Sequence, residues 1–84
     1  MAHVIGIKLN GAEDNSAVLT IDNATVNINN DLATLLWNSI VEFLNNYCID
    51  CKWNNDGNAV YKMSNLVVKV RRAKDEIEFD FEER

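Results

Sequence analysis

Residues 30–47, NDLATLLWNSIVEFLNNY, decide the fold, because they carry the period of an amphipathic helix. Asn30 is expected to cap this helix, and Asp31 would lie at the positive end of the helix dipole. Apolar side chains recur at three- and four-residue spacing, which predicts a broad face docked on a sheet. That expected inward face consists of Leu32, Leu35, Leu36, Ser39, Ile40, Phe43, Leu44 and Tyr47.

Three stretches before the helix alternate apolar and polar side chains, as strands with one buried face do. Asp22 and Asn23 tolerate positive φ and predict a two-residue turn between the second and third strands. With that turn, Ile21 faces Ala24 and every inward side chain meets another. The expected apolar faces are Ile5, Ile7 and Leu9, then Ala17, Leu19 and Ile21, then Ala24, Val26 and Ile28.

Four more strands are expected after the helix, with turns at residues 54–58, at residues 64–65 and near residues 73–74. In the last hairpin, outward charges would pair Arg71 with Glu76 and Lys69 with Glu78. The expected apolar faces are Ile49, Cys51 and Trp53, then Ala59, Tyr61 and Met63, then Leu66, Val68 and Val70, then Ile77, Phe79 and Phe81.

The chain of 84 residues, 48% hydrophobic, is therefore expected to form a single α+β domain over residues 1–84. We predict a single α-helix packed on a curved antiparallel β-sheet in the order β-β-β-α-β-β-β-β, because all the strand connections are short. The pattern leaves open whether the strands form one sheet or two meanders around the helix.

The net charge of −5 predicts repulsion from nucleic acid and from anionic membranes. No stretch approaches the ~18 consecutive apolar residues of a membrane span. The first residues, Met1 to Val4, lack the basic and apolar segments of a secretory signal. We therefore expect a cytoplasmic protein.

The last strand concentrates acidic side chains: Glu76, Glu78, Asp80, Glu82 and Glu83. One interpretation is a charged edge strand that resists pairing with the edges of other sheets. The other is a surface that imitates the phosphates of nucleic acid and binds a basic protein.

Trp37 and Val41 lie outside the expected inward face of the helix. One interpretation is a helix covered by sheet on two sides. The other is an exposed apolar patch that binds a partner or a second copy of the chain, since Trp is a typical interface anchor.

Cys48 and Cys51 have C-x-x-C spacing but follow a helix C-terminus, where the dipole disfavours a thiolate. Within a strand their side chains would point to opposite faces. We expect ordinary reduced cysteines; the alternative is a metal or disulfide shared between chains. His3 is remote from both, and no convergent catalytic, cofactor-binding or metal-binding set is visible.

The leading hypothesis is a small acidic, non-enzymatic protein-binding module without a cofactor, such as a phage or mobile-element inhibitor that docks on a basic nucleic-acid-handling protein. The alternative is a homo-oligomeric structural or assembly subunit, in the simplest case a homodimer, joined through Trp37 and Val41. A further alternative is weak RNA binding through Lys69 and Arg71. Direct nucleic-acid binding is not the expected role, because Trp53 and Tyr61 should face inward and cannot stack on bases.

Overall fold

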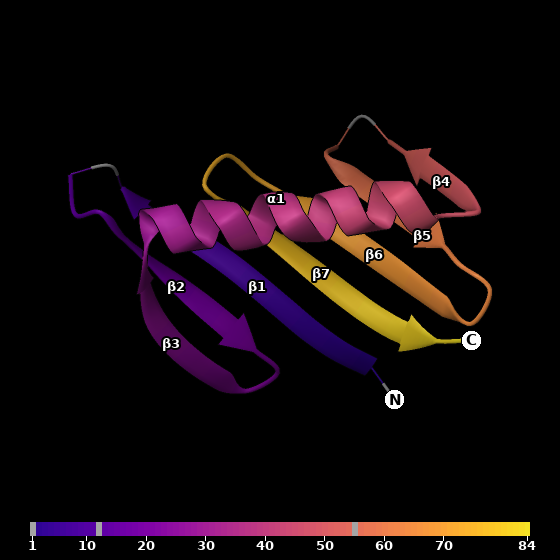
Figure 1. The fold of residues 1–84 in the computed structure, drawn as a ribbon, viewed down its shortest axis with the longest axis horizontal. Coiled ribbons are helices and arrows are strands. Elements are labelled where there is room, and N and C mark those ends of the chain that lie inside the picture. Colours follow the sequence, from indigo (N-terminus) through magenta and orange to yellow (C-terminus); the bar gives the residue numbers. More distant parts are fainter. Residues whose placement is uncertain (1, 12, 55) are drawn as a thin grey trace.

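The computed structural model describes residues 2–11, 13–54 and 56–84, which form one helix and seven strands (Figure 1). Residues 1, 12 and 55 lie outside this set, and the expected turn over residues 54–58 includes one of them. The elements in chain order are β1 (Ala2–Gly11), β2 (Ser16–Ile21), β3 (Ala24–Asn29), α1 (Asn30–Tyr47), β4 (Asp50–Trp53), β5 (Asn58–Lys62), β6 (Leu66–Arg72) and β7 (Glu76–Glu83).

The seven strands form one antiparallel sheet in the order β3-β2-β1-β7-β6-β5-β4, and α1 packs on one of its faces (Figure 1). The expected α+β fold and element order are therefore confirmed. Two meanders, β1–β3 and β4–β7, are joined because the first and last strands pair with each other. In that pairing Ile7 lies opposite Ile77 and Ile5 lies opposite Phe79.

The β2–β3 hairpin has the expected register, with Ile21 opposite Ala24 and Leu19 opposite Val26. Asp22 in its turn has a φ of 53°. This positive φ suits a short polar side chain that can hydrogen-bond locally.

The expected register of the β6–β7 hairpin is wrong by two residues. Arg71 lies opposite Glu78 and Lys69 lies opposite Asp80, because the tight turn falls one residue later than expected. It is closed by a hydrogen bond of 2.9 Å from the Ala73 amide to the Glu76 carbonyl. A shift of two residues keeps every side chain on its face of the sheet, so apolar alternation alone could not detect it.

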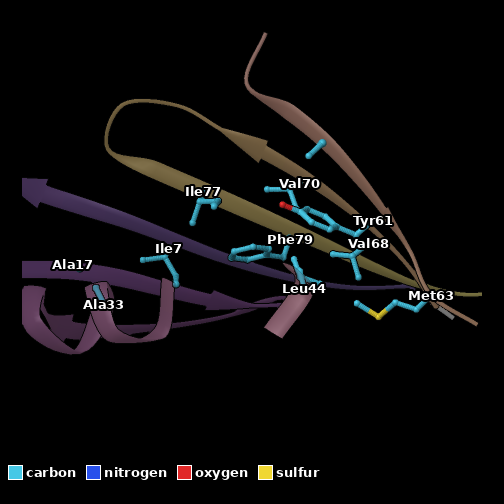
Figure 2. Close-up of a cluster of buried hydrophobic side chains, with 11 residues drawn as sticks. Ile7, Ala17, Ala33, Leu44, Tyr61, Met63, Val68, Val70, Ile77 and Phe79 are labelled. Carbon is cyan, nitrogen blue, oxygen red and sulfur yellow. The ribbon is translucent and has the colours of Figure 1, made fainter. Parts of the chain in front are cut away.

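The core lies between α1 and the sheet (Figure 2). Phe79 and Tyr61 are its largest fully buried side chains, and Ala17 and Ala33 are fully buried where the helix approaches β2. Edge strand β4 is covered less: Trp53 shares a face with Tyr61, and their rings make an edge contact at 5.7 Å, but Trp53 remains half exposed. Ile49, expected inward, is 75% exposed because it precedes β4 at a bend.

Helix α1 is rotated about its axis relative to the expectation. Leu35 and Tyr47, expected inward, are 61% and 66% exposed, whereas Ala33 is fully buried. The sheet-facing stripe is Ala33, Leu36, Trp37, Ile40, Val41, Leu44 and Cys48. The helix cap is also one residue earlier, since Asn29 Oδ1 accepts a hydrogen bond of 2.8 Å from the Leu32 amide.

Candidate protein-binding surfaces

Strand β7 lies in the middle of the sheet, between β1 and β6. The interpretation of its acidic residues as protection of an exposed edge is therefore wrong, since the edges of the sheet are β3 and β4. Ile77, Phe79 and Phe81 face α1, so the residues that alternate with them point to the opposite side. We call this side, on which the structure places no helix, the open face of the sheet.

Four of the five predicted acidic residues lie together on the open face, in a row along β7. The fifth, Glu83, has the parity of Phe81, so it lies on the helix side of the sheet, where it pairs with Leu66. On the open face the acidic residues therefore form a row of four, not five, carboxylates. The row consists of Glu76, Glu78, Asp80 and Glu82.

Basic side chains from the neighbouring strands flank this row. The Arg71 guanidinium donates a hydrogen bond of 2.6 Å to Glu78, and that contact raises the pKa of Arg71 above its ordinary value. Lys69 Nζ lies 4.0 Å from Glu82 Oε1, and Lys8 on β1 lies opposite Glu76. Because these groups are exposed and screened by solvent, each pair contributes little to folding.

Asp80 differs from the other three carboxylates. Its Oδ1 atom is buried and has no hydrogen-bond partner among the described residues, although Lys69 lies on the adjacent strand. Buried polar atoms in folded proteins are nearly always partnered, because desolvating one without a partner is unfavourable. Asp80 is therefore the carboxylate of the row whose hydrogen-bonding capacity the fold satisfies least.

Hollows lie on the open face on both sides of β7. On β1, Gly6 lies opposite both Thr20 and Glu78, and its missing side chain leaves a hollow over β1 next to Glu76. The second hollow, over β5 and β6, is lined by Asn58, Val60, Lys69, Arg71, Glu78 and Asp80. The acidic row thus forms a ridge between two depressions.

Trp37 and Val41 are partly buried against the core of their own chain. The prediction that they lie outside the core-facing stripe is wrong, because the helix packs on a stripe that contains them. The exposed apolar side chains of α1 are those of Leu32, Leu35, Phe43 and Tyr47. The sequence contained a sign of this rotation of α1. The expected stripe has polar Ser39 at its centre, whereas the observed stripe contains no hydroxyl, amide or charged side chain.

Cys48 and Cys51 both pack against the core, so the opposite-face arrangement expected for two cysteines within one strand does not occur. Strand alternation does not apply, because Cys48 is the C-cap of α1 and precedes β4. Burial raises the pKa of the Cys51 thiol, and burial also raises the pKa of Tyr61, which lies opposite Cys51, to about 12. Among the described residues, no three His, Cys, Asp or Glu side chains are placed to hold a metal ion together.

Comparison with known proteins returns no match: none of the protein-family models, curated proteins or solved structures compared with this chain resembles it. No helix in the described part of the chain has the length and hydropathy of a membrane span.

Proposed function

We propose that this chain is a non-enzymatic module that binds a basic partner protein through the open face of its sheet, with β7 at the centre. The observation that carries the proposal is the unpartnered Oδ1 of Asp80 within a row of carboxylates. Oδ1 is buried in the free chain, but Asp80 lines the hollow over β5 and β6. A partner Arg or Lys that enters this hollow and turns the carboxylate would supply the missing donor, and hydrogen bonds between charged groups are stronger than those between neutral ones.

The position of the acidic row supports the same proposal. Charged residues at a sheet edge can be explained by resistance to aggregation, but β7 is a central strand and needs no such protection. The hollows on both sides of the row could receive side chains that flank the basic group of the partner. This surface combines charge with shape, as specific interfaces do.

Weak RNA binding through Lys69 and Arg71 is less well supported. Both side chains lie beside carboxylates of β7, and Arg71 is hydrogen-bonded to one of them. The aromatic residues of the described strands, Trp53, Tyr61, Phe79 and Phe81, have helix-side parity, so the open face offers no ring on which a base could stack. The inhibitor role and the cytoplasmic location expected from the sequence stay part of the proposal.

Affinity capture with charge-matched baits tests this proposal. The test variant combines Glu76→Gln, Asp80→Asn and Glu82→Gln, and leaves the Arg71–Glu78 pair intact. The control combines Glu13→Gln, Asp14→Asn and Glu83→Gln, which removes the same three charges from exposed positions outside the acidic row. We expect wild type and control to retain a basic protein from a lysate of the source organism that the test variant does not retain.

The association kinetics of the captured protein then separate recognition from nonspecific attraction. A recognition surface steers a basic partner, so the association rate of wild type should fall steeply with ionic strength. Equal retention by the test and control variants, with the same salt dependence, would show that only net charge matters and would reject the open face as a specific site.

A further inference from the structure

We infer that two copies of this chain associate through one side of α1, in an antiparallel helix pair centred on Ser39. This surface lies on the helix side of the sheet, so the inference does not depend on the function proposed for the open face. We call it the helix flank, and it consists of Leu32, Leu35, Ser39, Phe43 and Tyr47.

The helix flank is exposed although it is largely apolar. Its four large side chains are between 42% and 66% exposed, and Phe43 and Tyr47 lie ring to ring with centroids 5.1 Å apart. At 100° per residue, the flank is centred roughly 120° from the middle of the sheet-facing stripe. The sheet of the same chain therefore leaves much of it uncovered.

The order of residues along the flank makes it complementary to its own copy. A two-fold axis through Ser39 would place Leu35 opposite Phe43 and Leu32 opposite Tyr47, so the shorter side chains of one end meet the aromatic rings of the other. Ser39 would face Ser39 of the second copy, and its small side chain allows the helices to approach closely. Such reciprocal pairing is what a two-fold symmetric interface requires.

The charge distribution also favours a second copy over a charged partner. The chain carries a net charge of −5, so two copies repel each other, and this repulsion is smallest when the surfaces that meet are uncharged. The helix flank contains no charged residue, and the acidic residues of α1, Asp31 and Glu42, lie on the solvent side of the helix, about 80–100° from the centre of the flank and next to its edge at Leu35.

The end of the sheet beyond α1 enlarges this surface. Figure 1 shows that α1 crosses the strands near one end and leaves the opposite end, with the β2–β3 turn, uncovered. In Figure 1, α1 runs from β3 toward β4. For a right-handed helix with this direction and this sheet-facing stripe, the helix flank lies on the side of that uncovered end. Ile21 and Val26, next to the turn, have helix-side parity and are 48% and 51% exposed. A second helix beside α1 would cover them.

The exposed area is close to what a stable dimer needs. The four large flank side chains, with Ile21 and Val26, expose on the order of 600 Å² per chain, before their polar neighbours are counted, against ~800 Å² per partner in a standard interface.

Sedimentation equilibrium at ~100 µM tests the inference, because a dimer with a Kd well below that concentration would be the main species. We expect wild type to be a dimer and the double variant Leu35→Lys, Tyr47→Lys to be a monomer with an unchanged unfolding temperature, because both side chains are mostly exposed. The matched control, Asn38→Lys with Asn45→Lys, places the same charges roughly 130° away on the helix and should remain dimeric.

A chemical cross-link locates the two-fold axis. In a Cys48→Ser, Cys51→Ser background, Ser39→Cys should be joined to its copy by a short bismaleimide, whereas Asn45→Cys should not. A monomeric wild type would overturn the inference. A dimer that survives the Leu35 and Tyr47 changes, or that cross-links no better at residue 39 than at residue 45, would equally overturn it and would point to the exposed edge of β3 instead.

Discussion

Asp22 connects the β2–β3 turn to β1. Its Oδ1 accepts a hydrogen bond of 3.0 Å from the Val4 amide, and its Oδ2 lies 3.0 Å from His3 Nδ1. The His3 contact, followed by the Val4 amide, lowers the pKa of Asp22 below its ordinary value of 3.8. The ionised carboxylate is therefore the form that the folded chain favours.

We predict that Asp22→Asn destabilises the protein at neutral pH but not in strong acid. Because the folded-state pKa is lowered, the stabilisation is complete above pH 3.8 and is lost as the pH falls through the lower folded-state pKa. Urea unfolding of wild type and variant from neutral pH down to about pH 2 checks this. The difference in stability should shrink with acid; a constant difference would contradict the assignment.

At the scale of the elements, apolar alternation predicted the strands and their faces well, because a slip of one residue would expose a buried face. Apolar alternation could not predict three other features. The two-residue shift of β6–β7 preserves the faces, and the turn at Lys74 and Asp75 is marked by Asp75 alone, with no Gly or Asn beside it to fix its position. The rotation of α1 depends on how close Ala33 can approach the sheet, which is a tertiary property.

The rotation of α1 predicts unequal effects of two substitutions on the helix. Trp37→Ala should lower the free energy of unfolding by about 2–3 kcal/mol, since it removes a large side chain that is partly buried in the core. Leu35→Ala should change it by less than about 0.5 kcal/mol, because Leu35 is mostly exposed and Ala favours helix. Urea titrations under conditions that keep the protein monomeric measure both values; similar losses would contradict the observed orientation.

At the scale of the whole molecule, the pairing of the first and last strands creates the candidate binding surface. The acidic row of β7 lies between Lys8 of β1 and the basic residues of β6, and the Gly6 hollow exists only because β1 is adjacent. The acidic residues of β7 were evident from the sequence, but the pairing of β7 with β1 was not, since β1 lies at the other end of the chain. A pattern along one strand cannot show which distant strand completes the sheet.

The most direct test of the proposed binding surface is to measure folding stability and partner affinity for Asp80→Asn. Its unpartnered Oδ1 serves the fold least, so we predict an unfolding temperature equal to or above that of wild type. Loss of a hydrogen bond between charged groups, worth about 1.5–3 kcal/mol, should weaken binding of the captured partner about tenfold or more. Glu83→Gln, the same loss of charge on the helix side, should change neither quantity. A lower unfolding temperature with unchanged affinity for Asp80→Asn would contradict the account, because Asp80 would then serve the fold and not a partner.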